Sequence, residues 1–433
     1  NLNLNNSGGA IGCSGNASPM IFDNNFSYNQ AGQGGALFVD GGESSISENN
    51  FIENSANVGG ALYLKSFGSD EISENEFLHN SSTDMGGAIF LDSSSLIIDS
   101  GNFIENFSSH GGAVSVQNSD SISFQGIKGI GNEANASASG NGGFLYQGLN
   151  SISAKFVNCI LSGNRANRYG GVVRASAKLT FTNCTIVGNE SLDAGGVVIL
   201  FEGDSLNLEN SILWNNHSLW GNEIAVYSGS ASAHYSLFDP AESEGVINGT
   251  ENISVDPLFV DQDGLDGILG TSDDDFQLQA SSPAINIGSN GFTDYPSHDI
   301  LGKSRSGKPD LGAYEFWVNS PPEIISGSTV SLSENQTDVI KVLALDNEGE
   351  SLTFSIMDGL DGSLFSIDEF TGSLSFVSPP DFEQALDLDE NGEYQLTIGV
   401  SDGTSISEQL LRVSPYDVDE APTIDQINNT LKI

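Results

Sequence analysis

The first half of the chain repeats a Gly-Gly doublet at nearly constant intervals. The doublets begin at Gly8, Gly34, Gly59, Gly86, Gly111, Gly142, Gly170 and Gly195. An asparagine keeps the same rhythm and stands at Asn29, Asn54, Asn80, Asn106, Asn132, Asn164, Asn189 and Asn216. Successive doublets are 25 to 31 residues apart. A fixed period of this size indicates one supersecondary unit that is stacked on itself.

Each unit contains short β-rich segments rather than helices. In residues 34–54 (GGALFVDGGESSISENNFIEN), short apolar runs are separated by Gly, Asp, Asn and Ser. Two or three such strands per turn are typical of a right-handed parallel β-helix. Because each strand pairs with its copy in the next coil, about 4.8 Å away, like residues stack on like. We expect an amide ladder in the Asn column and corner positions for the glycines.

Two paired motifs carry a resemblance to a known family. Gly-Gly-Ala-[Ile/Leu/Val] occurs at 8–11, 34–37, 59–62, 86–89 and 111–114, and Phe-x-x-Asn occurs at 26–29, 51–54, 77–80 and 103–106. Together they resemble the repeats of the polymorphic outer-membrane proteins, which are β-helical surface adhesins. Later units, with Asn-Cys-x-x-x-Gly-Asn at 158–164 and 183–189, are similar to repeats of large secreted bacterial proteins. The resemblance implies an extracellular location and an adhesive role.

Composition restricts the partners of the chain. Its 433 residues include 13 Lys and Arg against 58 Asp and Glu, a formal net charge of −45. Nucleic acid and anionic membrane surfaces are poor partners for such a chain, since both require positive patches. No apolar run approaches the length of about 18 residues that spans a bilayer. The chain begins inside a repeat and stops soon after a new segment opens, so we expect a piece of a longer protein.

A change of pattern near Pro321-Pro322 divides the chain, because alternating apolar strands follow that linker. The sequence predicts an all-β protein: a parallel β-helix followed by a β-sandwich. The expected parts are β-helix coils over 1–219, irregular terminal coils with an acidic cap over 220–318, a cadherin-like sandwich over 319–420, and a truncated further repeat over 421–433.

The expected cap contains a loop that is rich in carboxylates. Residues 261–275 hold six carboxylates and three glycines. Several oxygen ligands on a flexible loop suit a hard cation, so the sequence predicts Ca²⁺ here. The predicted ligands are Asp261, Asp263, Asp266, Asp273 and Asp275. A solvated acidic turn is the alternative.

The acidic motifs of the second domain resemble the motif series of a cadherin repeat. These motifs are SEN at 333–335, ALDNE at 344–348, DFE at 381–383, VSDG at 400–403 and DVDEAP at 417–422. The resemblance implies Ca²⁺ at the C-terminal junction, held by Glu334, Asp381, Glu383, Asp417, Asp419 and Glu420. It places Asp346, Glu348 and Asp402 at the N-terminal junction, where linker 318–320 has no carboxylate and calcium is not favoured. Solvated surface charge is the alternative.

Catalysis is not favoured by the residues. A polysaccharide lyase needs a basic residue beside an acidic cation site, and an inverting glycosidase needs two separated carboxylates. The basic concentration of the chain consists of Lys155, Arg165, Arg168, Arg174 and Lys178, with Asp193 one coil further on. This set could line a sugar-binding face, but the sequence favours scattered surface charge. The sequence contains no hydrolase, phosphate-loop or metal-histidine motif.

The sequence therefore favours a segment of a large extracellular bacterial surface protein with a calcium-stiffened, cadherin-like stalk. Its function would be adhesion or construction of a surface structure. The expected partners are a cell-surface protein, a polysaccharide or another copy of the chain. A polysaccharide-degrading β-helix enzyme and a structural subunit of an extracellular filament are the two alternatives.

Overall fold

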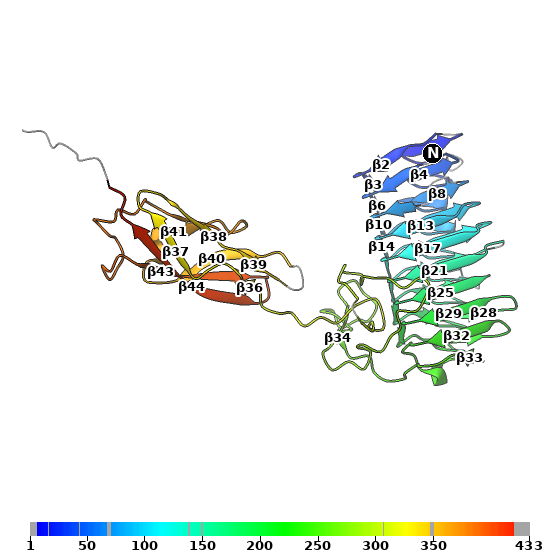
Figure 1. Ribbon diagram of the computed structural model, residues 1–433. Coiled ribbons are helices and arrows are strands. Elements are labelled where there is room, and N and C mark those ends of the chain that lie inside the picture. The colour runs from blue at the N-terminus through cyan, green and yellow to red at the C-terminus, as the bar shows by residue number, and fades with distance from the viewer. Residues whose placement is uncertain are drawn as a thin grey trace, which may run out of the picture. The chain divides into compact units, whose positions relative to one another are not determined.

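The protein, a computed structural model, is all-β and divides into two compact units, Asn1–Phe316 and Trp317–Ile433 (Figure 1). The structure describes residues 7–15, 17–42, 44–66, 71–136, 139–148, 150–305, 307–346 and 350–419. The expected further repeat at 421–433 and the predicted ligand Glu420 lie outside these residues.

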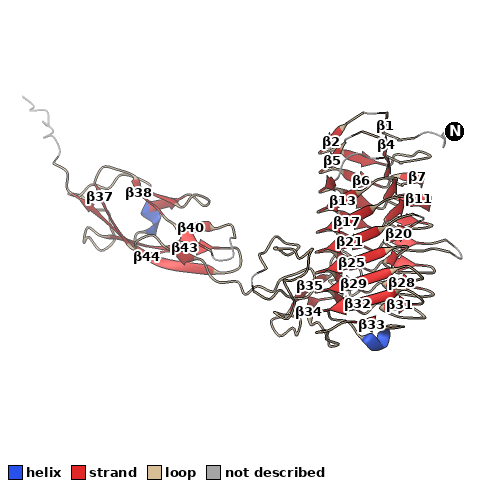
Figure 2. Ribbon diagram, turned by 45° about the vertical axis from the view of Figure 1, so that its right-hand side comes forward, coloured by secondary structure: helices blue, strands red, loops and turns tan. Residues whose placement is uncertain are grey.

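The first unit is a parallel β-solenoid of about eight turns in its described residues (Figures 1 and 2). Sheet 1 follows the Gly-Gly doublets and consists of β1 (Ile11–Ser14), β4 (Leu37–Asp40), β8 (Leu62–Lys65), β12 (Ile89–Asp92), β16 (Val114–Gln117), β20 (Leu145–Gln147), β24 (Val173–Arg174), β28 (Val198–Leu200) and β31 (Ile224–Val226). Sheet 2 consists of β2 (Met20–Phe22), β5 (Ser45–Ser47), β9 (Glu71–Ser73), β13 (Leu96–Asp99), β17 (Ser121–Gln125), β21 (Ser153–Val157), β25 (Lys178–Thr182), β29 (Ser205–Glu209), β32 (Ser230–His234) and β33 (Ile247–Asn248).

Sheet 3 leads to the Asn column and consists of β3 (Asn25–Ser27), β6 (Asn50–Ile52), β10 (Glu76–Leu78), β14 (Asn102–Ile104), β18 (Lys128–Ile130), β22 (Ile160–Ser162), β26 (Thr185–Val187) and β30 (Ile212–Trp214). Sheet 4 consists of the short strands β7 (Ser55–Val58), β11 (Ser81–Met85), β15 (Phe107–Ser108), β19 (Glu133–Ala134), β23 (Arg165–Ala166) and β27 (Glu190–Ser191). The coils from β4 to β27 thus have four strands, one more than the upper end of the expected two or three, whereas the coils β1–β3 and β28–β30 have three. The strands of sheet 4 are short and mostly polar, so no apolar run in the sequence predicts them.

The Gly-Gly corner explains the strictest feature of the repeat. Gly34 has φ +62°, a conformation that L side chains rarely adopt. A Cβ on the following Gly35 would lie 2.0 Å from the carbonyl oxygen of Gly60 in the next coil. One glycine is therefore required for its backbone angle and the other for the close approach of two coils.

The predicted amide ladder is confirmed. Asn54 donates from Nδ2 to Oδ1 of Asn80 at 3.0 Å, and its backbone amide donates to the same oxygen at 3.0 Å. The pattern continues through the column until Asn216, whose Nδ2 donates to Oε2 of Glu223 at 2.7 Å. Because these groups are buried, the ladder satisfies polar atoms that would otherwise be costly to enclose.

Stacked phenylalanines fill the bore. The ring centroids of Phe51 and Phe77 lie 5.0 Å apart, and those of Phe77 and Phe103 lie 4.7 Å apart. At the next coil Gly129 takes this position, and the ring of Phe144 occupies the space that a Cβ would need. The ring of Phe144, which comes from a different column of the coil, thus fills the space beside Gly129.

η1 (Pro240–Glu242) lies at the end of the stack, where the amide of Glu223 donates to the carbonyl oxygen of Glu242. The rest of the first unit packs against the outside of the later coils. It contains β34 (Phe259–Asp261) and β35 (Asp275–Leu278), followed by an irregular segment, 286–316, called the arm here. Arg305 of the arm is 6% exposed and donates from Nη2 to Oδ1 of Asn158 at 3.0 Å. The segment therefore lies along the side of the solenoid, and residues distant in sequence meet there.

The second unit is a β-sandwich. Its elements are β36 (Glu323–Ile324), β37 (Thr329–Ser333), β38 (Asp338–Lys341), β39 (Ala344–Leu345), β40 (Thr353–Asp358), η2 (Gly362–Leu364), β41 (Phe365–Ile367), β42 (Ser373–Phe376), β43 (Tyr394–Ser401) and β44 (Ile406–Tyr416). One sheet has the order β37-β44-β43-β40, with β37 parallel to β44, and a second has the order β38-β42-β41. Phe354, Leu396 and Val400 are among the residues of the shared core.

Candidate functional site

Three of the predicted calcium ligands meet after β37 and β44. Carboxylate oxygens of Glu334, Glu383 and Asp417 all lie within 4.8 Å of one another. The parallel register pairs Ser333 with Tyr416, so the residues that follow the two strands emerge side by side. We call these three residues the C-terminal acidic group.

Glu334 holds this group in place. Its side chain is buried, with 2% of the residue exposed. Oε2 accepts a hydrogen bond from the amide of Phe382 at 2.6 Å, and Oε1 accepts one from the amide of Val418 at 2.8 Å. Both neighbouring segments are therefore fixed to one buried carboxylate, while Glu383 and Asp417 remain exposed.

Two other predicted ligands of this junction, Asp381 and Asp419, are not part of the group. Asp381 accepts a hydrogen bond from the amide of Gln384 at 2.9 Å, which closes a local turn. Asp419 is exposed and lies outside the three-residue group. Calcium binding by these two side chains therefore stays a prediction.

A second acidic group lies at the opposite end of β44. Carboxylate oxygens of Asp346, Glu350 and Asp402 lie within 4.8 Å of one another, and we call this set the N-terminal acidic group. Sequence reasoning named Asp346 and Asp402 but missed Glu350. The antiparallel pairing of Thr353 with Ser401 places the chain just before β40 beside the turn after β43. The predicted Glu348 lies outside the described residues.

The linker contributes an amide to this group. Asn319 donates from Nδ2 to Oδ2 of Asp402 at 3.0 Å and to the hydroxyl of Ser405 at 3.1 Å. Hydrogen bonds from the amide of Ser405 and from Asn319 lower the pKa of Asp402 below its usual value. Asp402 is thus held as an anion that faces two further carboxylates.

The acidic loop, residues 261–275, is organised by its own backbone. Asp273 accepts a hydrogen bond from the amide of Leu265 at 2.7 Å, and Asp266 accepts one from the amide of Ile268 at 2.8 Å. Asp261 and Asp275 are register partners in the β34–β35 pair. Among the residues that the structure describes, no carboxylate of this loop belongs to a cluster of three side chains close enough to hold a metal ion. Calcium binding here, with Asp263 as a further ligand, stays a prediction.

The loop has a contact role that its composition did not indicate. A Cβ on Gly163 would lie 2.3 Å from the carbonyl oxygen of Gly270, and one on Gly188 would lie 2.8 Å from Cγ of Leu269. Burial raises the pKa of the neighbouring Asp274 to about 6. The tip of the loop is therefore seated against a glycine corner of the solenoid.

The basic residues considered for a sugar-binding or catalytic face lie on different sheets. Arg165 is in sheet 4, Arg174 in sheet 1, and Lys155 and Lys178 in sheet 2. Arg165 pairs with Glu190 at 2.9 Å, Arg168 with Asp193 at 3.7 Å, Arg174 with Asp204 at 3.8 Å and Lys155 with Asp294 at 2.8 Å. Because these residues are distributed over three sheets, they do not form the single catalytic cluster that the enzyme alternative requires.

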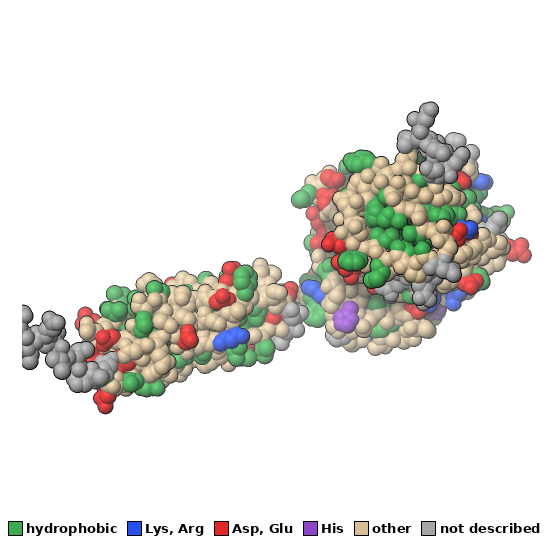
Figure 3. All heavy atoms as spheres, turned by 90° about the horizontal axis from the view of Figure 1, so that it is seen from above, with side chains coloured by type: hydrophobic (Ala, Val, Ile, Leu, Met, Phe, Trp, Pro, Cys, Tyr) green, Lys and Arg blue, Asp and Glu red, His purple; other side chains and the backbone are tan. Residues whose placement is uncertain are grey.

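Acidic side chains are spread over the face seen in Figure 3. Apolar side chains gather in the middle of the solenoid in the same view, as expected for a filled bore. In the described part of the chain, no helix is long and apolar enough to cross a membrane.

Comparisons with known proteins give partial likenesses. No protein-family profile matches the chain. Halomucin from Haloquadratum walsbyi is 28% identical over 148 residues, which cover 33% of this chain and 1% of that protein. Solved structures similar to part of the chain include human protocadherin-24 EC1-2 (22% identity, TM-score 0.20, covering 23% of this chain and 45% of that one) and the protocadherin GammaB4 extracellular domain (27% identity, TM-score 0.21, covering 24% and 17%).

Proposed function

We propose that this chain is part of an extracellular surface protein, with a role in adhesion or in building a surface structure, and that Ca²⁺ binds at the ends of its sandwich. The observation that carries the calcium proposal is the pair of acidic groups at opposite ends of β44. The similarity to Halomucin supports the surface location.

Electrostatics supports a cation at both ends. Three carboxylates within 4.8 Å repel one another strongly unless a cation or protons compensate them. Hard cations such as Ca²⁺ prefer several carboxylate and carbonyl oxygens on a partly flexible frame. In the C-terminal group, backbone hydrogen bonds hold the buried Glu334 in place, and Glu383 and Asp417 add two exposed carboxylates. Bound calcium would fix the segments on either side of each group.

The solenoid suits a role outside the cell. Its inner strands are hydrogen-bonded to neighbours on both sides, which leaves few free strand edges for proteases or for aggregation. The partners proposed for such a surface are a cell-surface protein, a polysaccharide or another copy of the chain.

Calcium-dependent melting tests the proposal. We expect millimolar Ca²⁺ to raise the melting temperature of the sandwich unit by several degrees, following the linkage between ligand binding and stability. Glu383→Gln and Glu350→Gln should each reduce this shift, because each removes a charge from one acidic group. Glu369→Gln, at an exposed glutamate outside both groups, serves as the control. An identical melting curve in calcium and in chelator would contradict the proposal.

A further inference from the structure

A groove crosses the outside of the solenoid beside the arm. Two adjoining hollows of about 520 Å³ and 650 Å³ share Gln125, Val157 and Pro296 in their linings. Their floor comes from β13, β17 and β21 of sheet 2, with Asn102 and Lys128 at the starts of β14 and β18 of sheet 3, and residues 293–302 of the arm form the wall. The groove thus extends over three successive coils.

The floor is a rigid platform. Ile97, Ser123 and Lys155 are register partners in one column of sheet 2, and Asp99, Gln125 and Val157 form the next. Hydrogen bonds between neighbouring strands occupy the backbone amides and carbonyls, so a ligand would be bound through side chains. Successive side chains in a column are about 4.8 Å apart, which suits an extended ligand that lies along the stack.

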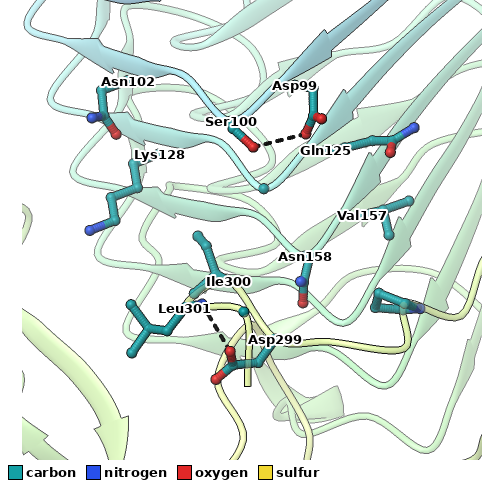
Figure 4. A pocket seen from close by; sticks show the side chains of 13 residues that line it. Asp99, Ser100, Asn102, Gln125, Lys128, Val157, Asn158, Asp299, Ile300 and Leu301 are labelled. Atoms are coloured by element: carbon teal, nitrogen blue, oxygen red, sulfur yellow. Dashed lines mark hydrogen bonds between the residues drawn. The ribbon is translucent and has the colours of Figure 1, made fainter. Parts of the chain in front are cut away.

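The wall is fixed to the floor at separate points. Lys155 pairs with Asp294 at 2.8 Å, and Asn158 donates from Nδ2 to the carbonyl oxygen of His298 at 2.8 Å. Asp299 accepts a hydrogen bond from the amide of Leu301 at 2.9 Å, which holds the tip of the wall (Figure 4). The wall is therefore already ordered before a ligand enters the groove, which lowers the entropy cost of binding.

Alcohol and amide side chains are the largest group in the lining, beside three aspartates, two lysines and several apolar residues. Figure 4 shows Asn102 and Lys128 on one side of the first hollow and Gln125 on the other. Ser121, Ser123 and Ser153 line the second hollow. Among the described residues, the Lys128 ammonium has no carboxylate within ion-pair distance. These groups offer donors and acceptors in fixed positions with little net charge.

We propose that this groove binds an uncharged glycan chain that runs along the solenoid. Sugar hydroxyl groups match the serines and amides, and Lys128 offers a strong donor to a hydroxyl or acetamide oxygen. Tyr295 and Pro296 of the wall provide apolar faces for the C–H surfaces of a sugar ring. The inference rests on the proposed surface role, since it names the kind of partner that such a protein would meet.

The charge of the protein selects against other ligands. A net charge of −45 repels polyanions such as nucleic acid or heavily sulfated glycans. A peptide that adds to a sheet needs a free strand edge, but the floor strands are paired on both sides. An uncharged, hydroxyl-rich chain meets neither obstacle.

Binding of the full chain to oligosaccharides tests the proposal. Neutral glucan, mannan and galactan oligomers would be compared by calorimetry with uronate-containing and sulfated oligomers of matched length. We expect at least one neutral oligomer to bind. Ser123→Tyr should abolish binding by filling the floor, and Lys128→Ala should weaken it about tenfold because a charged donor is lost.

Asn207→Tyr is the matched control, because Asn207 stands in the same outward column as Ser123 but outside the groove. Unchanged binding by this variant would show that an outer tyrosine leaves the solenoid folded. No binding to any oligomer, binding to charged oligomers alone, or full binding by Ser123→Tyr would overturn the proposal. Release of reducing ends would overturn it in favour of an enzyme. Calcium-dependent melting is measured separately, so either proposal can fail without the other.

Discussion

At the scale of single residues, the Asn ladder requires a special residue where it ends. Every ladder asparagine donates from Nδ2 toward the next coil, so the last one, Asn216, needs a further acceptor. Glu223 supplies it from a position that is only 4% exposed. Burial raises the pKa of Glu223 to about 8, and the nearby carboxylates of Glu242 and Asp239 add to this effect. The side chain is therefore mainly protonated at neutral pH.

This burial predicts a pH dependence of solenoid stability. Glu223 has a usual pKa of 4.5 and a folded pKa of about 8, so between these values the folded state binds more protons than the unfolded state. The free energy of unfolding should fall as pH rises from 4.5 to 8 and then level off. Glu223→Gln should remove this slope and be more stable at pH 8.5 by up to about 5 kcal/mol. Denaturant unfolding at several pH values measures the effect.

The matched control for this titration is Glu202→Gln, which replaces an exposed carboxylate of the solenoid that is not among the charges acting on Glu223. At pH 4 the wild type and Glu223→Gln should have similar stability, because the carboxyl group is protonated in both the folded and the unfolded state. Parallel pH profiles for the wild type and Glu223→Gln would refute the assignment.

A break in the middle of the ladder should be more damaging than one outside it. Asn106→Ala removes the oxygen that accepts from the backbone amide and the Nδ2 of Asn80, at 2.9 and 3.0 Å. It also removes the donor to the carbonyl oxygen of Phe77. We expect a loss of about 3–5 kcal/mol, because several buried polar groups lose their partner. Asn102→Ala, in the same coil but on the outer face, should cost less than about 1 kcal/mol in the same denaturation experiment.

At the scale of elements, the acidic loop explains a change of residue type along one corner. The residues directly before the ladder asparagines all have positive φ, between 50° and 64°. They are Tyr28, Glu53, His79, Glu105, Gly131, Gly163, Gly188 and Asn215. Backbone angle alone does not require glycine, because other coils accept larger residues there. Glycine stands at Gly163 and Gly188 because the loop tip touches these two coils.

Two alanine substitutions separate docking from backbone strain. Gly163→Ala would bring its Cβ within 2.3 Å of the Gly270 oxygen, whereas Gly131→Ala would stay 4.0 Å from it, at the same φ of +62°. Both variants carry the same left-handed strain of about 1–2 kcal/mol. We expect only Gly163→Ala to release the loop, seen as faster amide hydrogen exchange over residues 263–274. Equal exchange in the two variants would show that the contact does not hold the loop.

At the scale of the whole molecule, the net charge is the main influence on how stability depends on salt. A formal charge of −45 produces self-repulsion that weakens the folded state at low ionic strength. Salt screens this repulsion over a Debye length of about 10 Å at 0.1 M and about 3 Å at 1 M.

Raising the sodium chloride concentration from about 0.05 M to 1 M should therefore increase the melting temperatures of both units by several degrees. Calcium added at constant ionic strength should act further on the sandwich, because both acidic groups lie in that unit. Differential scanning calorimetry can follow the two transitions. Lower melting temperatures in high salt would contradict the dominance of self-repulsion.

The sequence allowed part of the candidate site to be predicted. Glu334, Glu383 and Asp417 were named from their motifs, and the structure brings their carboxylates together. Glu350 was missed, because its place depends on strand pairing between β40 and β43. Asp273 stays a predicted ligand, and the structure adds that its Oδ2 accepts backbone hydrogen bonds within its own loop. Acidic residue types are visible in a sequence, whereas the partner of each carboxylate is not.

By itself, the sequence determined the solenoid. Each coil contacts mainly its neighbours, so a repeat of Gly, Phe and Asn positions translates directly into stacked corners, rings and amides. Only the tertiary structure decided where the arm lies and how it builds the groove. The contacts of Arg305 with Asn158 and of Lys155 with Asp294 join residues 147 and 139 positions apart. No repeat in the sequence predicts these two contacts, because they depend on surface complementarity between non-repeating segments rather than on local pattern.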